Sequence, residues 1–261
     1  MSGLFDGDIP DPKDPDPIKR AQASLKPQYP KRFYKEAAVA VVGEGFAVQL
    51  DGRPVRTPGR AVLALPTEAL AKLVADEFAA QDEHIVPISM PVLRLANSAI
   101  DGVLPEMRAV LEDVVKYASS DLLCYRAEGP ERLVERQSKT WDPVLEWAKT
   151  ALGARFYLAE GVMHVEQPAE TLDAIRNWLL QREEPFRLAA IHTMTSITGS
   201  ALLALAAEAG AFSADDVWEA AHLDERWTSE HWGEDAEAME RERNRRRDFD
   251  AALKTCQALS A

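Results

Sequence analysis

Cysteine is scarce in this sequence, and so are signals for secretion and membrane insertion. Its 261 residues include two cysteines, too few for a disulfide framework or a four-cysteine zinc site. Cys124 and Cys256 therefore predict a reducing compartment, in which both thiols are small buried groups. The stretch 1–30 has no apolar core and holds five aspartates, so it resembles neither a secretory signal nor an arginine-rich presequence. We expect a cytoplasmic protein of a bacterium.

Positive charge is also in short supply. The chain carries 30 Lys and Arg against 43 Asp and Glu, a formal net charge of -13, which argues against a general nucleic-acid or anionic-membrane binder. Five arginines lie between residues 241 and 247, but the stretch 234–250 also holds seven acidic residues. Alternating signs of this kind predict a solvated, ion-paired helix face, which could also serve as a docking surface for a partner.

The sequence has few long apolar stretches, and only one of them is long enough to suggest a membrane span. The 20 residues from Leu188 to Ala207 contain no Asp, Glu, Lys or Arg, and a run of about this length can cross a bilayer. The run is rich in Ala, Ser, Thr and Gly, however, and a helix that is apolar on most faces is equally suited to the centre of a soluble bundle. We predict such a central helix and no membrane insertion.

Strand signals dominate the sequence before residue 66. Phe46, Val48 and Leu50 alternate with Ala47 and Gln49, the period of a half-buried strand. The dipeptide at 51–52, Asp-Gly, follows directly and favours a tight hairpin, because a type I′ turn needs positive φ at both positions. Together with the turns at 43–45 and 58–59, this pattern predicts an antiparallel meander of about four strands over 33–65.

Helical periodicity dominates after Pro66. Asp142 and Pro143 are expected to end one helix and start another, and Ser213 with Asp216 forms a variant of the capping box. These patterns predict an α+β fold, an N-terminal antiparallel β-rich domain followed by a C-terminal orthogonal helical bundle. The expected division is an extended Pro/Asp-rich arm at 1–30, the β-rich domain with helices at 31–118 and the mainly helical domain at 119–261.

The residue patterns give little support to enzyme chemistry. The sequence lacks a nucleotide-binding P-loop, and the Gly43–Gly45 turn lacks the third glycine of a dinucleotide site. Glu219 and His222 have the spacing used in di-metal bundles, but such sites need a second copy of the motif. Ser119 and Ser120 do not form a nucleophile elbow. We therefore predict no catalytic residue, no metal site and no cofactor.

Several stretches of the chain, taken together, resemble one protein family. The match extends over about residues 32 to 258, and the order and spacing of its motifs make it specific. One departure is Phe78, at a position where the family often carries Trp. The stretches that carry the resemblance are Gln81–Ile85 followed by Pro91–Asp101, Tyr117–Ala127, Gln137 with Trp141–Pro143, and Trp232–Ala238. The chain is similar to the assembly chaperones of the F-type ATP synthase, which hold the alpha subunit of the soluble catalytic head.

The resemblance implies a binding function without catalysis. It implies the ATP synthase alpha subunit as the partner, protected from aggregation until it pairs with beta, and a chaperone that is itself monomeric. The acidic C-terminal segment is the expected contact surface, with Trp232 as an anchor and the carboxylates as rim contacts. The predicted partner-binding residues are Trp232, Glu234, Asp235, Glu237 and Glu240.

Two rival interpretations remain open at this point: a structural module that binds some other protein, and an enzyme. The chain could be a small-molecule enzyme that uses acidic and histidine residues in a cleft between its two domains. Such an enzyme would need a convergent cluster of buried titratable groups with shifted pKa values, which a chaperone would not need.

Overall fold

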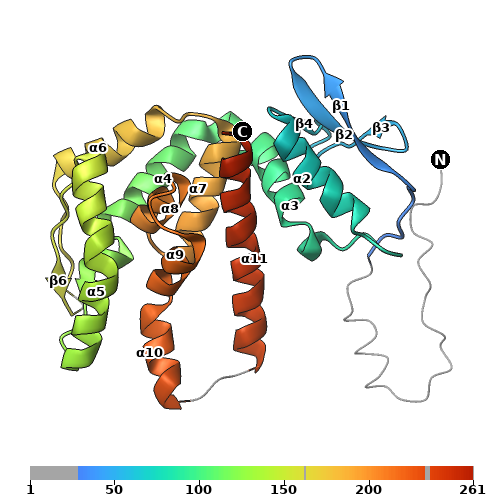
Figure 1. Cartoon of the computed structure of the whole chain (residues 1–261). Helices are drawn as coiled ribbons and strands as arrows, with labels where there is room; N and C mark the ends of the chain where they lie inside the picture. The colour runs from blue at the N-terminus through green and yellow to red at the C-terminus, as the bar shows by residue number, and fades with distance from the viewer. Residues whose placement is uncertain (1–28, 162, 233–235, 261) are drawn as a thin grey trace, which may run out of the picture.

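The computed structural model describes residues 29–161, 163–232 and 236–260, and it omits the side chains of 231, 232 and 236–238. A small sheet with two helices lies at one end of the molecule, and the remaining helices form a bundle beside it (Figure 1). The C-terminal helix lies between the two parts in this view. The predicted α+β fold, with an antiparallel sheet followed by helices, is confirmed.

The sheet is organised around one central strand. Strand β2 (Gly45–Leu50) pairs with β1 (Ala37–Val42) over six residue pairs, and it also pairs with the two-residue strands β3 (Arg53–Pro54) and β4 (Ala64–Leu65). The predicted turn after β2 is confirmed, with φ of 49° at Asp51 and 78° at Gly52. These are the positive angles that a type I′ turn requires.

The predicted meander is wrong in its last step. Strand β4 pairs with β2 instead of with its sequence neighbour β3, and the chain between β3 and β4 pairs with itself through the Arg56–Val62 bridge. The turn of this small hairpin contacts Asp101, whose carboxylate accepts hydrogen bonds from Thr57 Oγ1 at 2.7 Å and from Gly59 N at 2.8 Å. That carboxylate holds the intervening loop against the following helices.

Two helices cover the sheet and lead into the bundle. Helix α2 (Glu68–Ala79) begins at the cap residue Thr67 and packs on β1 and β2. Helix α3 (Pro91–Ser98) follows, and a π-helical turn (Ala99–Val103) connects it through a 3-10 turn to α4. The bundle comprises α4 (Met107–Ser119), α5 (Glu131–Trp147), α6 (Ala169–Leu180), α7 (Pro185–Thr198), α8 (Ala201–Glu208), α9 (Ala214–Ala221), α10 (Leu223–Trp232) and α11 (Ala236–Ala258). Strands β5 (Tyr125–Arg126) and β6 (Ala159–Glu160) form a short parallel pair.

The long apolar run is central to the bundle, as predicted, but it is two helices. Gly199, with φ of 69°, ends α7, and the Ser200 hydroxyl caps α8 by accepting a hydrogen bond from Leu203 N. Both helices are largely buried, and α7 packs on α4, α8 and α11. Within the described ranges, no helix is long and apolar enough to span a bilayer.

The predicted helix break at Asp142 and Pro143 is wrong. Helix α5 continues through Pro143 to Trp147. Both residues are exposed, so the carbonyl that loses its partner at the proline lies on the solvent side of the helix. The Asp142 carboxylate does not cap a new helix, because it pairs with the guanidinium of Arg126 at 2.7 Å.

The end of the chain follows its sequence pattern closely. Ser213 Oγ accepts a hydrogen bond from Asp216 N at 3.1 Å, which confirms Ser213 as the N-cap, while the Asp216 carboxylate accepts from the Ser213 hydroxyl at 2.6 Å instead of from its backbone N–H. Phe249, Leu253 and Cys256 are buried on one face of α11. Its outer face is ion-paired, as predicted, for example between Arg94 and Asp248 at 2.5 Å. The domain boundary at residue 118 stays a prediction, since α4 on its N-terminal side packs on both α6 and α7.

Candidate functional site

The predicted contact segment lies where α10 ends and α11 begins. Glu234 and Asp235, together with the side chains of Trp232 and Glu237, lie outside the described part of the structure. Glu240 is exposed on the first turns of α11. Figure 1 shows the end of α10 and the start of α11 at the same end of the molecule, and we use the name α10–α11 tip for the sequence segment 232–240 that joins them.

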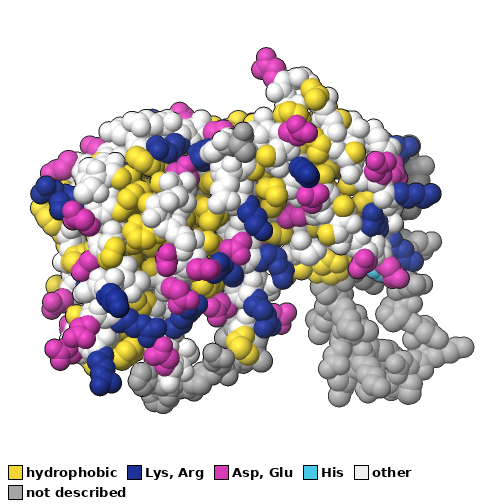
Figure 2. Space-filling view, viewed as in Figure 1, with side chains coloured by type: hydrophobic (Ala, Val, Ile, Leu, Met, Phe, Trp, Pro, Cys, Tyr) yellow, Lys and Arg dark blue, Asp and Glu magenta, His cyan; other side chains and the backbone are white. Residues whose placement is uncertain are grey.

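An apolar groove between α5 and α9 approaches this tip. Figure 2 shows hydrophobic side chains gathered between α5 and the pair α8 and α9. The groove has a volume of about 540 Å³. Its apolar lining comprises Pro143, Val144, Leu203, Phe212, Val217 and Ala220. A groove of this size can take one or two large apolar side chains of a partner, which is the usual form of an interface anchor.

Charged residues of opposite sign line the two sides of the α5–α9 groove. Arg136 and Lys139 lie on α5, and Asp216 and Glu219 lie on α9. The guanidinium of Arg136 also pairs with Glu230 on α10 at 2.8 Å, which ties the groove to the helix that carries the tip. The groove therefore has an apolar floor and a charged rim, and one of its rim residues contacts the helix that leads to the tip.

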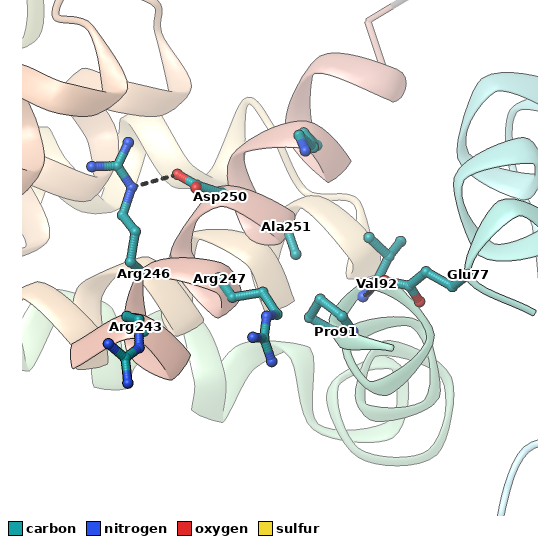
Figure 3. A pocket seen from close by; sticks show the side chains of 9 residues that line it. Glu77, Pro91, Val92, Arg243, Arg246, Arg247, Asp250 and Ala251 are labelled. Carbon is teal, nitrogen blue, oxygen red and sulfur yellow. Dashed lines mark hydrogen bonds and ion pairs between the residues drawn. The ribbon is translucent and has the colours of Figure 1, made fainter. Parts of the chain in front are cut away.

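A second groove separates the sheet-side helices from the C-terminal helix. It has a volume of about 290 Å³, and Figure 3 shows α2 and α3 residues on one side of it and α11 residues on the other. The sheet-side lining is Glu77, Pro91 and Val92, and the α11 lining is Arg243, Arg246, Arg247, Asp250, Ala251 and Lys254. We call this the α3–α11 groove.

Glu77 is the most perturbed acid of the α3–α11 groove. Its carboxylate accepts hydrogen bonds from Val92 N and Leu93 N, both at 2.8 Å, and so caps the N-terminus of α3. Burial raises the pKa of Glu77 to about 7, although those hydrogen bonds and the charges of Arg94 and Lys254 oppose the rise. The native protein therefore holds this proton more tightly than the unfolded chain does.

Stability is expected to fall as pH rises from about 4.5 to about 7 because of Glu77. In that window the unfolded chain releases the proton first, so ionisation favours unfolding by about 2–3 kcal/mol. The measurement is chemical unfolding of the wild type and of Glu77→Gln, which cannot titrate, across this pH range. The difference in unfolding free energy between the two proteins should change by that amount. A difference that stays constant with pH would show that Glu77 titrates normally.

Most motif residues that carried the family resemblance have structural roles. Gln137 Oε1 accepts a hydrogen bond from Ala127 N at 2.9 Å, and its Nε2 donates to Asp224 on α10 at 2.8 Å. The indole of Trp141 donates to Ala220 O at 2.9 Å. These buried polar contacts tie α5 to α9 and α10, and so set the geometry of the α5–α9 groove.

The groups with strongly raised pKa values do not share a pocket. Burial raises the pKa of Glu77 to about 7, that of Asp121 to about 6 and those of Cys124 and Cys256 to about 12. Among them only Glu77 lines a groove described above. The two thiols stay protonated at neutral pH and are buried, as the sequence predicts.

The side chains of the Glu219–His222 pair, which have the spacing of a di-metal motif, are engaged in separate contacts. His222 is buried and lies against the ring of Trp218 at a centroid distance of 4.0 Å, while its Nδ1 lies 2.9 Å from Trp218 O. The Glu219 carboxylate pairs with Arg226 instead. In the part of the chain that the structure describes, no group of three or more His, Cys, Asp or Glu side chains is placed to hold a metal ion.

Comparison with known proteins gives a consistent set of relatives. A family model for the ATP12 chaperone protein matches residues 31–149. The mitochondrial protein atp12 of Schizosaccharomyces pombe is 25% identical over 226 residues, which cover 81% of this chain and 77% of that protein. The crystal structure of Atp12 from Paracoccus denitrificans is 38% identical with a TM-score of 0.82, covering 88% of this chain and 98% of that one. The Atu1473 protein of Agrobacterium tumefaciens is 52% identical with a TM-score of 0.86, covering 95% and 92%.

Proposed function

The chain belongs to the ATP12 chaperone protein family, and from this premise we propose that it binds the free alpha subunit of the F-type ATP synthase during assembly of the soluble catalytic sector. An alpha subunit without its beta neighbours exposes the apolar surface that later packs between subunits, and large exposed apolar patches drive aggregation. A partner that covers such a patch stabilises the free subunit by mass action. We place this activity in the bacterial cytoplasm.

The observation that supports the proposal best is the α5–α9 groove, with its apolar floor, its charged rim and its contact to α10. The groove offers an apolar floor for one or two anchors, and the Arg136–Glu230 pair links it to the helix that leads to the tip. A small apolar centre inside a charged rim favours steering and release over very tight binding. Such an interface suits a chaperone that must give its client up to the beta subunit, and we propose release by that exchange.

The direct test is a pull-down of alpha from the native cytoplasm on the tagged full-length chain, combined with light scattering of purified alpha. We expect alpha to be retained on the chain and its aggregation to be suppressed at about equimolar chaperone. Retention of other proteins without alpha, or equal aggregation with and without the chain, would contradict the proposed function.

Charge reversal at the tip tests the predicted contact residues separately. Glu237→Lys together with Glu240→Lys is expected to weaken alpha binding by about tenfold at low salt, because the reversed charges remove steering and add repulsion. The matched control is Glu166→Lys together with Glu170→Lys, which reverses two exposed charges far from the tip in sequence and should bind like the wild type. Unchanged binding of the double variant would remove the tip from the client surface without removing the proposed function.

A further inference from the structure

The α3–α11 groove is positively charged in a chain that is strongly acidic overall. Arg243, Arg246, Arg247 and Lys254 line it against two carboxylates, those of Glu77 and Asp250, a net of +2. The whole chain carries -13. A cluster of positive charge on a negatively charged protein indicates a binding site for a negatively charged ligand or partner segment.

Both carboxylates in the groove are engaged with other groups. Three of its cations have no ion-pair partner among the described residues, although Arg247 donates hydrogen bonds to Ile88 O and Asn244 Oδ1. Glu77 accepts two backbone hydrogen bonds, and Arg246 is paired with Asp250 at 2.8 Å and with Asp215 at 2.5 Å. The side chains of the other three cations, Arg243, Arg247 and Lys254, are exposed, and within the described residues no carboxylate forms an ion pair with any of them. They follow one another at spacings of four and seven residues, so they share one face of α11. Figure 3 shows Arg243 and Arg247 on that helix beside the groove.

The sequence itself contains a segment of complementary charge. Residues 6–16, which lie outside the described part, hold five aspartates and one lysine, a net of -4. Pro10, Pro12 and Pro15 lie among these aspartates. Prolines restrict the unbound chain to extended conformations, which lowers the entropy lost when an acidic strand is fitted into a groove.

The chain enters the described structure close to this groove. Pro30 O accepts a hydrogen bond from Ile85 N at 2.9 Å. Ile88, three residues after Ile85, accepts a hydrogen bond through its backbone O from Arg247 at 3.2 Å. Three residues span at most about 11 Å, whereas the 13 residues from Asp16 to Tyr29 can span about 45 Å. A tether of this length gives an effective concentration in the millimolar range, so individually weak ion pairs suffice.

We propose that the acidic segment Asp6–Asp16 of this chain binds in the α3–α11 groove, with its carboxylates paired to Arg243, Arg247 and Lys254. The segment then acts as an intramolecular ligand that bridges the sheet-side helices and the bundle. It also competes with any acidic segment of another protein for the same groove.

The experiment uses the full-length protein with a nitroxide label at Gly7→Cys, a substitution that leaves every charge in place. The native Cys124 and Cys256 are buried with raised pKa values, so the label reacts at the new thiol. We expect the label to broaden backbone amide signals most strongly along 243–254 of α11 and at the start of α3. Raising the salt concentration to about 0.5 M should reduce this broadening at least about threefold, because the contacts are ion pairs.

Two variants and one mixing experiment decide the outcome. Arg243→Glu with Arg247→Glu should abolish the selective broadening, whereas the control Arg132→Glu with Arg155→Glu makes the same charge change at exposed positions elsewhere and should leave it intact. Broadening that is even over the surface, or that survives the first double variant, would overturn the proposal. The mixing experiment combines isotope-labelled chains that carry no nitroxide with spin-labelled chains. The same broadening in this mixture would also overturn the proposal, since the occupant would then be a second copy.

Discussion

Replacing Asp121 with alanine is expected to lower the free energy of unfolding by about 3–5 kcal/mol. The side chain is fully buried, and its carboxylate accepts hydrogen bonds from Ser200 Oγ at 2.7 Å, Leu202 N at 3.0 Å and Leu123 N at 3.1 Å. Alanine leaves these three buried donors without an acceptor, and each unsatisfied group costs about 1–3 kcal/mol, less whatever relaxation or a water molecule recovers. The measurement is urea unfolding near pH 8, followed by circular dichroism.

The effect arises because Asp121 joins the end of α4 to the corner between α7 and α8. The more conservative Asp121→Asn keeps one acceptor oxygen but turns an amide group toward a donor, so it should lose about 1–3 kcal/mol. Asp82→Ala removes an exposed aspartate and should change stability by less than about 0.5 kcal/mol. If Asp121→Ala were as stable as this control, the buried network would not stabilise the corner.

Glu208→Ala is expected to have a similarly large effect, about 3–4 kcal/mol. The Glu208 side chain is only 3% exposed, with Arg187 Nη1 at 2.5 Å from Oε1 and Arg182 Nε at 3.4 Å from Oε2. Removing the carboxylate leaves the largely buried Arg187 without its counter-charge, and breaking one partner of a buried pair is strongly destabilising. Thermal and urea unfolding of the purified variant would measure the loss.

Two further substitutions separate the buried charge from simple loss of a side chain. Glu208→Gln keeps the shape and one acceptor but not the charge, so its stability should fall between that of the wild type and that of Glu208→Ala. Glu146→Ala breaks the exposed pair with Lys149 and should cost less than about 0.5 kcal/mol. Equal losses for Glu146→Ala and Glu208→Ala would show that burial adds nothing at Glu208.

The sequence pattern predicted much of the fold because many of the contacts that determine it join residues close together in the sequence. The hairpin at Asp51 and Gly52 depends on backbone angles of adjacent residues, and the cap at Ser213 depends on a hydroxyl three residues from its donor. Where a distant contact competes with local preference, the sequence-based prediction is wrong. Strand β4 pairs with the more distant β2 instead of with β3, and Asp142 fails to start a helix because Arg126 takes its carboxylate.

The candidate site was also predictable only in part from the sequence. The motifs that identified the family, such as Gln137 and Trp141, are spaced along the chain and could be recognised without a structure, but their buried hydrogen bonds show that they hold the fold together. The α5–α9 groove escaped prediction because its lining comes from α5 and from the segment 203–220, which is about 60 residues further along the chain. A signal for it was present in the apolar residues of α5 and α9, yet nothing in their order says that they face one another.

The sequence by itself determined the family, the α+β order of strands before helices, the acidic charge and the two inert cysteines, because composition, periodicity and motif spacing are properties of the chain alone. Only the tertiary structure decided that the long apolar run folds as two helices around Gly199, that α5 passes through Pro143, and that Arg243, Arg247 and Lys254 face Glu77 across a groove. These features depend on packing between residues up to about 180 positions apart, and the free energy of such contacts is not encoded in any local stretch.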